Sequence, residues 1–104
     1  MKDRIKVYLY NKTVKEIDKS DLTRITEDIF ANRTDFVKIV LPEGVEEICD
    51  YAFDDCTALE EVICPKSLKK IGKEAFSGCH NLRKIEYGPD VKVDATAFNG
   101  CYNL

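Results

Sequence analysis

Residues Leu59 to Leu82 read LEEVICPKSLKKIGKEAFSGCHNL, and this stretch decides the fold. It holds two short segments in which apolar and polar residues alternate, a pattern typical of strands. Pro65 ends the first segment, because a proline cannot donate to a strand ladder. Phe76 and Cys79 follow at a spacing of three, which favours one face of a helical turn. We therefore expect two extended segments and one helical turn in this stretch.

The same pattern recurs along the chain every 22 or 23 residues. Its markers are cysteines that lie three residues after a Phe and three before a Leu: Cys56, Cys79 and Cys101. A weaker copy has Ile29 and Arg33 in place of the Ala and the Cys. One repeat cannot bury its own apolar residues, but stacked repeats share a continuous core. We predict a single domain over 1–104, with an alternating strand cap at 1–13 and repeats at 14–35, 36–58, 59–81 and 82–104.

Length and composition agree with one folded domain. The chain has 104 residues, of which 44% are hydrophobic and 34% charged, which excludes a disordered chain and a membrane-spanning one. The net charge of −3 supplies no basic patch, and the tyrosines do not alternate with basic residues, so no nucleic-acid partner is expected. No nucleophile or phosphate-binding motif is present, and we predict that the protein is not an enzyme.

The repeat resembles the BspA-like, Treponema-type leucine-rich repeat family. The resemblance is close over 36–104, weaker over 14–35, and does not include 1–13. It implies an α/β repeat solenoid with short parallel strands, a second short extended segment and a helical turn in each repeat. It also implies binding through a surface rather than catalysis. Many members of this family are bacterial cell-surface or secreted adhesion-type proteins.

Repeats that stack in register bring equivalent residues about 4.8 Å apart, so these residues form columns. The outward columns of the first segment are Lys15, Val37, Glu60 and Arg83; Glu16, Lys38, Glu61 and Lys84; and Asp18, Val40, Ile63 and Glu86. The second segment has a column of Arg24, Glu47 and Lys70. Charge alternates along two of these columns, which favours in-register stacking.

The first-segment columns suggest where a partner binds. Val37, Val40 and Ile63 form a small apolar centre inside a charged rim, as in the core of an interface. The predicted protein-binding residues are Val37, Lys38, Val40, Glu60, Glu61, Ile63, Arg83, Lys84 and Glu86. The alternative interpretation is an ordinary solvated surface whose charges set the register of the repeats.

The five cysteines are odd in number, so they cannot all pair within the chain. Cys56, Cys79 and Cys101 are predicted to be buried thiols, and Cys64 shares a core strand position with Leu41 and Tyr87. Cys49, which stands where Gly72 stands one repeat later, is expected to be the most accessible. Cysteines seven and eight residues apart do not suit a metal site, so we expect no metal and no cofactor. His80 is expected to lie exposed in a turn.

Cellular location and context stay open from sequence. The chain has no signal peptide or membrane helix, which predicts a cytoplasmic protein if it is complete, and a surface or secreted one if it is an excised domain. The predicted function is a non-catalytic protein-interaction module. The alternatives are a fragment of a longer bacterial adhesin-type array and a stand-alone intracellular inhibitor or adaptor. The last repeat, 82–104, is expected to be uncapped and to mediate self-association.

Overall fold

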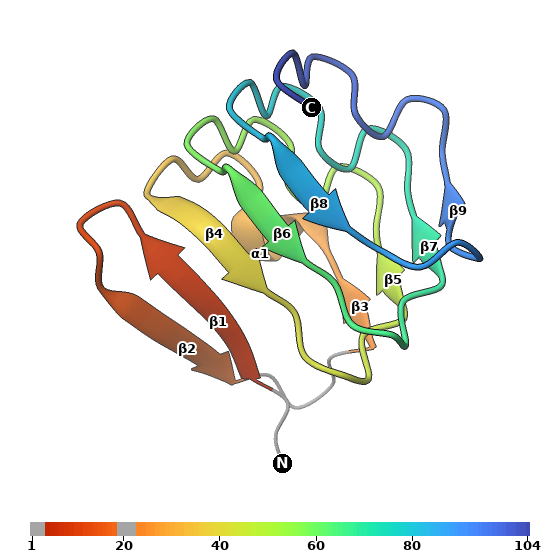
Figure 1. Cartoon of the computed structure of the whole chain (residues 1–104), viewed down its shortest axis with the longest axis horizontal. Helices are drawn as coiled ribbons and strands as arrows, with labels where there is room; N and C mark the ends of the chain where they lie inside the picture. Colours follow the sequence, from red (N-terminus) through yellow and green to blue (C-terminus); the bar gives the residue numbers. More distant parts are fainter. Residues whose placement is uncertain (1–3, 19–22) are drawn as a thin grey trace.

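The computed structural model describes residues 4–18 and 23–104, which wind into stacked coils (Figure 1). The coils contribute parallel strands to a larger sheet: β4 (Phe36–Val40), β6 (Glu61–Ile63) and β8 (Lys84–Glu86). They also form a four-stranded parallel sheet: β3 (Arg24–Ile25), β5 (Glu47–Ile48), β7 (Lys70–Ile71) and β9 (Lys92–Val93). The predicted repeat solenoid with short parallel strands is therefore confirmed. Residues 1–3 of the predicted cap and 19–22 of the first predicted repeat lie outside the described residues.

Prolines follow two strands of the larger sheet. Pro42 lies beyond β4 and Pro65 beyond β6. A proline has no N–H to extend the ladder, so the chain turns instead. Val45 N donates to Pro42 O over 3.4 Å, and Leu68 N donates to Pro65 O over 3.2 Å. Each turn leads directly into the strand of the four-stranded sheet.

The predicted helical turn is an α-helix in the first coil, where α1 spans Glu27–Phe30. In later coils it is a series of tight turns, with Cys79 N donating to Phe76 O over 3.1 Å. Gly78, just before Cys79, has a φ of +76°, a left-handed conformation that interrupts a right-handed helix. Helix content is therefore low. Within the described ranges, no helix has the length and apolar character needed to cross a bilayer.

A ladder of phenylalanines runs through the core, one from each coil. Phe30, Phe53 and Phe76 are fully buried, and Phe98 is half-buried. Successive ring centroids are 5.3, 4.9 and 5.4 Å apart, and the rings are nearly parallel. Such pairs contribute about 0.5–1.5 kcal/mol each beyond the apolar area that they bury. Each coil therefore covers the aromatic ring of the one before it.

An antiparallel hairpin covers the first coil. β1 (Arg4–Leu9) pairs with β2 (Val14–Asp18), and β1 also pairs antiparallel with β4. The strand order of the larger sheet is therefore β2-β1-β4-β6-β8. Ile5 and Val7 of β1 are buried in the core that the coils share. Tyr10 N donates to Asp35 O over 2.8 Å, which holds the end of the hairpin against the first coil.

Candidate functional site

The exposed face of the five-stranded sheet carries rows of side chains that cross its strands. One row is Tyr8, Lys38, Glu61 and Lys84; the next is Lys6, Val40, Ile63 and Glu86. A third follows from backbone bonds, since Glu60 N donates to Val37 O over 2.7 Å and Arg83 N donates to Glu60 O over 3.0 Å. The predicted columns are thus confirmed from β4 to β8. Figure 1 shows these three strands side by side.

The first member of each of the three predicted first-segment columns is wrong. Lys15, Glu16 and Asp18 lie on β2 and pair with β1, so none of them neighbours β4. Tyr8 lies opposite Lys38, and Lys6 lies opposite Val40. β1 takes the inner place with Ile5 and Val7 buried, whereas their register partners on β2, Ile17 and Lys15, are half-buried and exposed. The first repeat therefore joins the stack only from β3 onward.

Tyr8 and Lys38 form one wall of a groove beside β1. The Nζ atom of Lys38 lies 5.1 Å from the centroid of the Tyr8 ring, within the range of a cation–π interaction. The groove has a volume of about 410 Å³ and extends over Val37 to Glu60 and Arg83. Tyr10, which is 74% exposed, and Lys12 also line it. The groove therefore combines aromatic rings with charges of both signs.

Val40 and Ile63 are the apolar centre of the face. They lie in register on adjacent strands, and each is half-buried. Lys6 precedes them in the row and Glu86 follows, so the apolar pair lies between a cation and an anion. Burial of such a pair against a partner removes apolar area from water at about 25 cal/mol per Å².

Ion pairs join the charged side chains that lie beside Val40 and Ile63 on the face. Arg83 Nη2 lies 3.5 Å from Glu60 Oε1, and Lys84 Nζ lies 3.8 Å from Glu61 Oε2. Lys84 Nζ also lies 3.5 Å from Glu86 Oε2 on its own strand. These side chains are at least partly exposed, and exposed pairs contribute about 0–1 kcal/mol each. Their main effect is to fix the positions of charges on the face.

The four-stranded sheet has the predicted charge column as well. Glu47 lies between Arg24 and Lys70, with N–O distances of 3.4 and 3.9 Å. The next member is Lys92, in register beside Lys70. The column therefore ends in two adjacent cations.

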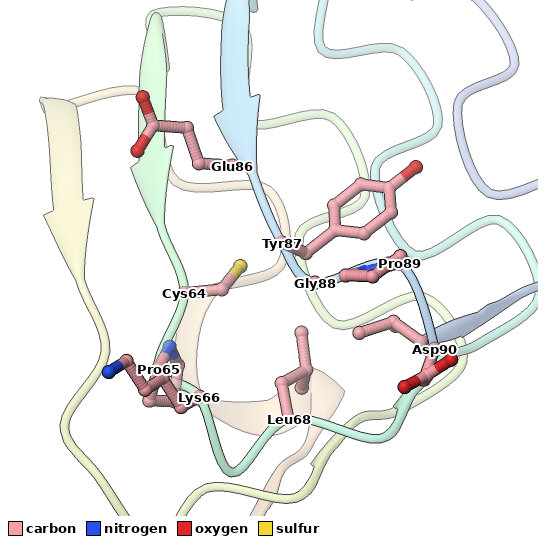
Figure 2. A pocket seen from close by; sticks show the side chains of 10 residues that line it. Cys64, Pro65, Lys66, Leu68, Glu86, Tyr87, Gly88, Pro89 and Asp90 are labelled. Atoms are coloured by element: carbon pink, nitrogen blue, oxygen red, sulfur yellow. The ribbon is translucent and has the colours of Figure 1, made fainter.

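A second groove, of about 360 Å³, lies between the last two coils near the ends of β6 and β8. Figure 2 shows Cys64 and Leu68 pointing into it, with Tyr87 and Pro89 on the other side. Cys64 stands where the previous coil has the larger, buried Leu41. Tyr87 is 40% exposed, so the prediction that it shares a core position is wrong. Among the described residues, no coil follows to cover its ring.

The cysteines follow the repeat rather than form a reactive centre. Cys56 and Cys79 are fully buried, and each thiol donates over 3.1 Å to a phenylalanine carbonyl of an earlier coil, Phe30 O and Phe53 O. Cys101 makes the same bond to Phe76 O but is half-buried. All five cysteines are free thiols.

Cys49 is not the most accessible cysteine, contrary to the prediction. It is only 8% exposed, and the Arg24 guanidinium interacts with its sulfur. Burial is the main reason that the pKa of Cys49 is raised. Burial also raises the pKa of Cys64 to about 12. The interaction with the Cys79 thiol lowers the pKa of Cys101.

His80 is exposed, as predicted, and its ring stacks on Tyr102 with centroids 5.6 Å apart. Its neighbour Cys79 is buried, so the two side chains do not form a nucleophile pair. In residues 4–18 and 23–104, no group of three or more His, Cys, Asp or Glu side chains is placed to hold a metal ion.

Sequence reasoning missed Tyr8, Tyr10 and Lys6 as members of the face. Their signal was present in the alternation of residues 4–10, which places Lys6 and Tyr8 opposite the apolar side of the strand. That alternation does not reveal which strand lies beside them.

The comparisons with known proteins agree with this fold. The BspA type leucine rich repeat region matches residues 4–104 in six copies, and the chain belongs to this family. A solved structure, the leucine rich repeat protein of T. pallidum, is similar over 65% of this chain and 35% of its own, at 35% identity and a TM-score of 0.61. No match was found among curated proteins. Leucine-rich repeat families are generally non-catalytic scaffolds and suggest a role in protein interaction.

Proposed function

We propose that the protein is a non-catalytic interaction module that binds a protein through the exposed face of its five-stranded sheet. The observation that carries this proposal is the in-register apolar pair Val40 and Ile63, placed between Lys6 and Glu86. Interface cores combine a small apolar centre with a polar rim, and the face has both.

The Tyr8 groove extends the binding surface toward the hairpin. Tyrosine is enriched where proteins meet, because its ring buries a large area and its hydroxyl still bonds to water or a partner. Tyr8 and Lys38 line this groove together with Glu60 and Arg83. A partner side chain placed there would contact an aromatic ring and charges of both signs.

Two alternative contexts use the same surface. The similar T. pallidum protein is longer than the matched region, which covers 35% of it, so an adhesin-type array is one context. An intracellular adaptor or inhibitor is the other. Both bind protein, and they differ in the partner and not in the chemistry of the face.

The test starts from partner capture in an extract of the source organism, followed by binding of the purified partner to variants. We expect Val40→Asp/Ile63→Asp to weaken binding at least about tenfold, which corresponds to about 1.4 kcal/mol. Ala95→Asp is the matched control, because Ala95 is exposed and outside the face. Wild-type affinity in the double variant, with the fold intact by circular dichroism, would refute the proposed surface.

A further inference from the structure

β8 and β9 each have an outer edge on which no strand pairs within the described chain. Successive residues of a strand direct their N–H and C=O groups to opposite sides. Lys84 N donates inward to Glu60 O over 3.2 Å, so the backbone groups of Ile85 lie on the outer edge. Lys92 N and Asp94 N likewise donate inward, to Lys69 O and Ile71 O, which leaves Val93 on the outer edge of β9. Such edges are templates for pairing with another strand.

Both edges carry the same order of side chains: a cation, an apolar residue and an acid. The segments are Lys84-Ile85-Glu86 and Lys92-Val93-Asp94. The corresponding segments of the previous coil, Glu61-Val62-Ile63 and Lys70-Ile71-Gly72, do not have this order.

This order is complementary to itself in one orientation only. If β8 pairs antiparallel with a second copy about Ile85, Lys84 of each copy lies opposite Glu86 of the other. Opposite charges across strands stabilise a pair, and like charges destabilise it. A parallel, in-register copy would instead place Lys84 against Lys84. In the antiparallel arrangement, the two Ile85 residues would exchange both backbone hydrogen bonds.

The last coil also retains apolar surface that its predecessor has buried. Val62, Ile71 and Phe76 are fully buried, whereas their equivalents Ile85, Val93 and Phe98 are only half-buried. Leu104, at the same end, is 51% exposed. A coil becomes buried when the next unit covers it, and a second copy supplies such a unit.

We propose that two copies of this chain join end to end, through antiparallel pairing of β8 with β8 about a two-fold axis at Ile85. The contact is isologous, so each copy contributes the same residues. The inference goes beyond partner binding, because it needs no partner. It would continue the five-stranded sheet, with its exposed face, into the second copy.

The test is a charge swap, read by sedimentation velocity of the 104-residue chain at low ionic strength. Lys84→Glu puts an acid on both sides of Ile85, and Glu86→Lys puts a cation on both sides. Each single variant would therefore face like charges across the two-fold axis. We expect the wild type to form dimers and each single variant to associate at least about tenfold more weakly.

The equimolar mixture of the two single variants is the decisive sample. It restores opposite charges in a mixed pair, so we expect association to return to the wild-type level. The doubly swapped chain, Lys84→Glu/Glu86→Lys, should dimerise as well. A monomeric wild type, single variants that associate like the wild type, or a mixture without recovery would each overturn the proposal. Val40→Asp/Ile63→Asp keeps the β8 edge and should still dimerise, which separates this test from that of the binding face.

Discussion

Lys38 lies over the ring of Tyr8, with its Nζ atom 5.1 Å from the ring centroid. The contact joins β4 to the N-terminal hairpin. It places an aromatic ring, rather than the Glu16 expected from the repeat pattern, beside the first charge of the exposed row.

Removal of this contact should lower stability by a small, measurable amount. A double-mutant cycle of Tyr8→Ala and Lys38→Met should give a coupling free energy of about 0.5–1 kcal/mol in urea unfolding, as expected for an exposed or half-buried cation–π pair. Tyr8→Phe, which keeps the ring, is the control and should retain the coupling. A coupling of zero would mean that the two side chains are neighbours without interacting.

Gly72 should not tolerate a methyl group. A Cβ there would lie 2.8 Å from the backbone nitrogen of Asp50, closer than packing allows. We expect Gly72→Ala to lower the free energy of unfolding by about 1–3 kcal/mol, as for other overpacked sites. Gly88→Ala is the matched control, since nothing lies within 4 Å of its Cβ position. Equal stability of the two variants would contradict the close stacking of the coils.

Two charge reversals in the column of the four-stranded sheet should have opposite effects on stability. Glu47→Lys would place a cation between Arg24 and Lys70 and should cost about 1 kcal/mol of unfolding free energy. Lys92→Glu would place an acid beside Lys70 and should stabilise the fold by a few tenths of a kcal/mol. Both effects should shrink in high salt because the groups are at least partly exposed. Effects of the same sign would show that this register does not hold in solution.

The thiols should react in an order set by exposure and pKa. Thiolate is the reactive form, so the lowered pKa of Cys101 should give it the fastest alkylation near neutral pH. As the pH is raised, its rate should reach a plateau at a lower pH than for an ordinary thiol. Cys64 is half-buried like Cys101, but its pKa of about 12 should keep it slow throughout that range. Mass spectrometry after timed iodoacetamide treatment measures both rates.

Cys79→Ala supplies the control for this order. It removes the thiol whose interaction lowers the pKa of Cys101, so the rate profile of Cys101 should move to higher pH. An unmoved profile, or faster reaction at the buried Cys49, would count against the stacked arrangement of the thiols.

The repeat alone was enough to predict most of the candidate face. A period of 22 or 23 residues gives equivalent residues the same environment, so Val40, Ile63 and Glu86 were correctly placed in one row. The same reasoning placed Cys49 wrongly. Cys49 is 8% exposed and interacts with the Arg24 side chain of the adjacent coil, which a comparison with Gly72 does not reveal.

The sequence by itself determined the solenoid, the inward phenylalanines and the register of the strands from β4 to β8, because these depend on a period repeated along the chain. The tertiary structure decided that β1, and not β2, lies beside β4, and so brought Tyr8 to the exposed face. β1 alternates apolar and polar residues, whereas β2 has apolar residues only at Val14 and Ile17, and both strands could pair locally. The choice depends on which apolar side covers the core, and Ile5 and Val7 do so through contacts with residues more than thirty positions away, as in the pairing of Val7 with Ile39.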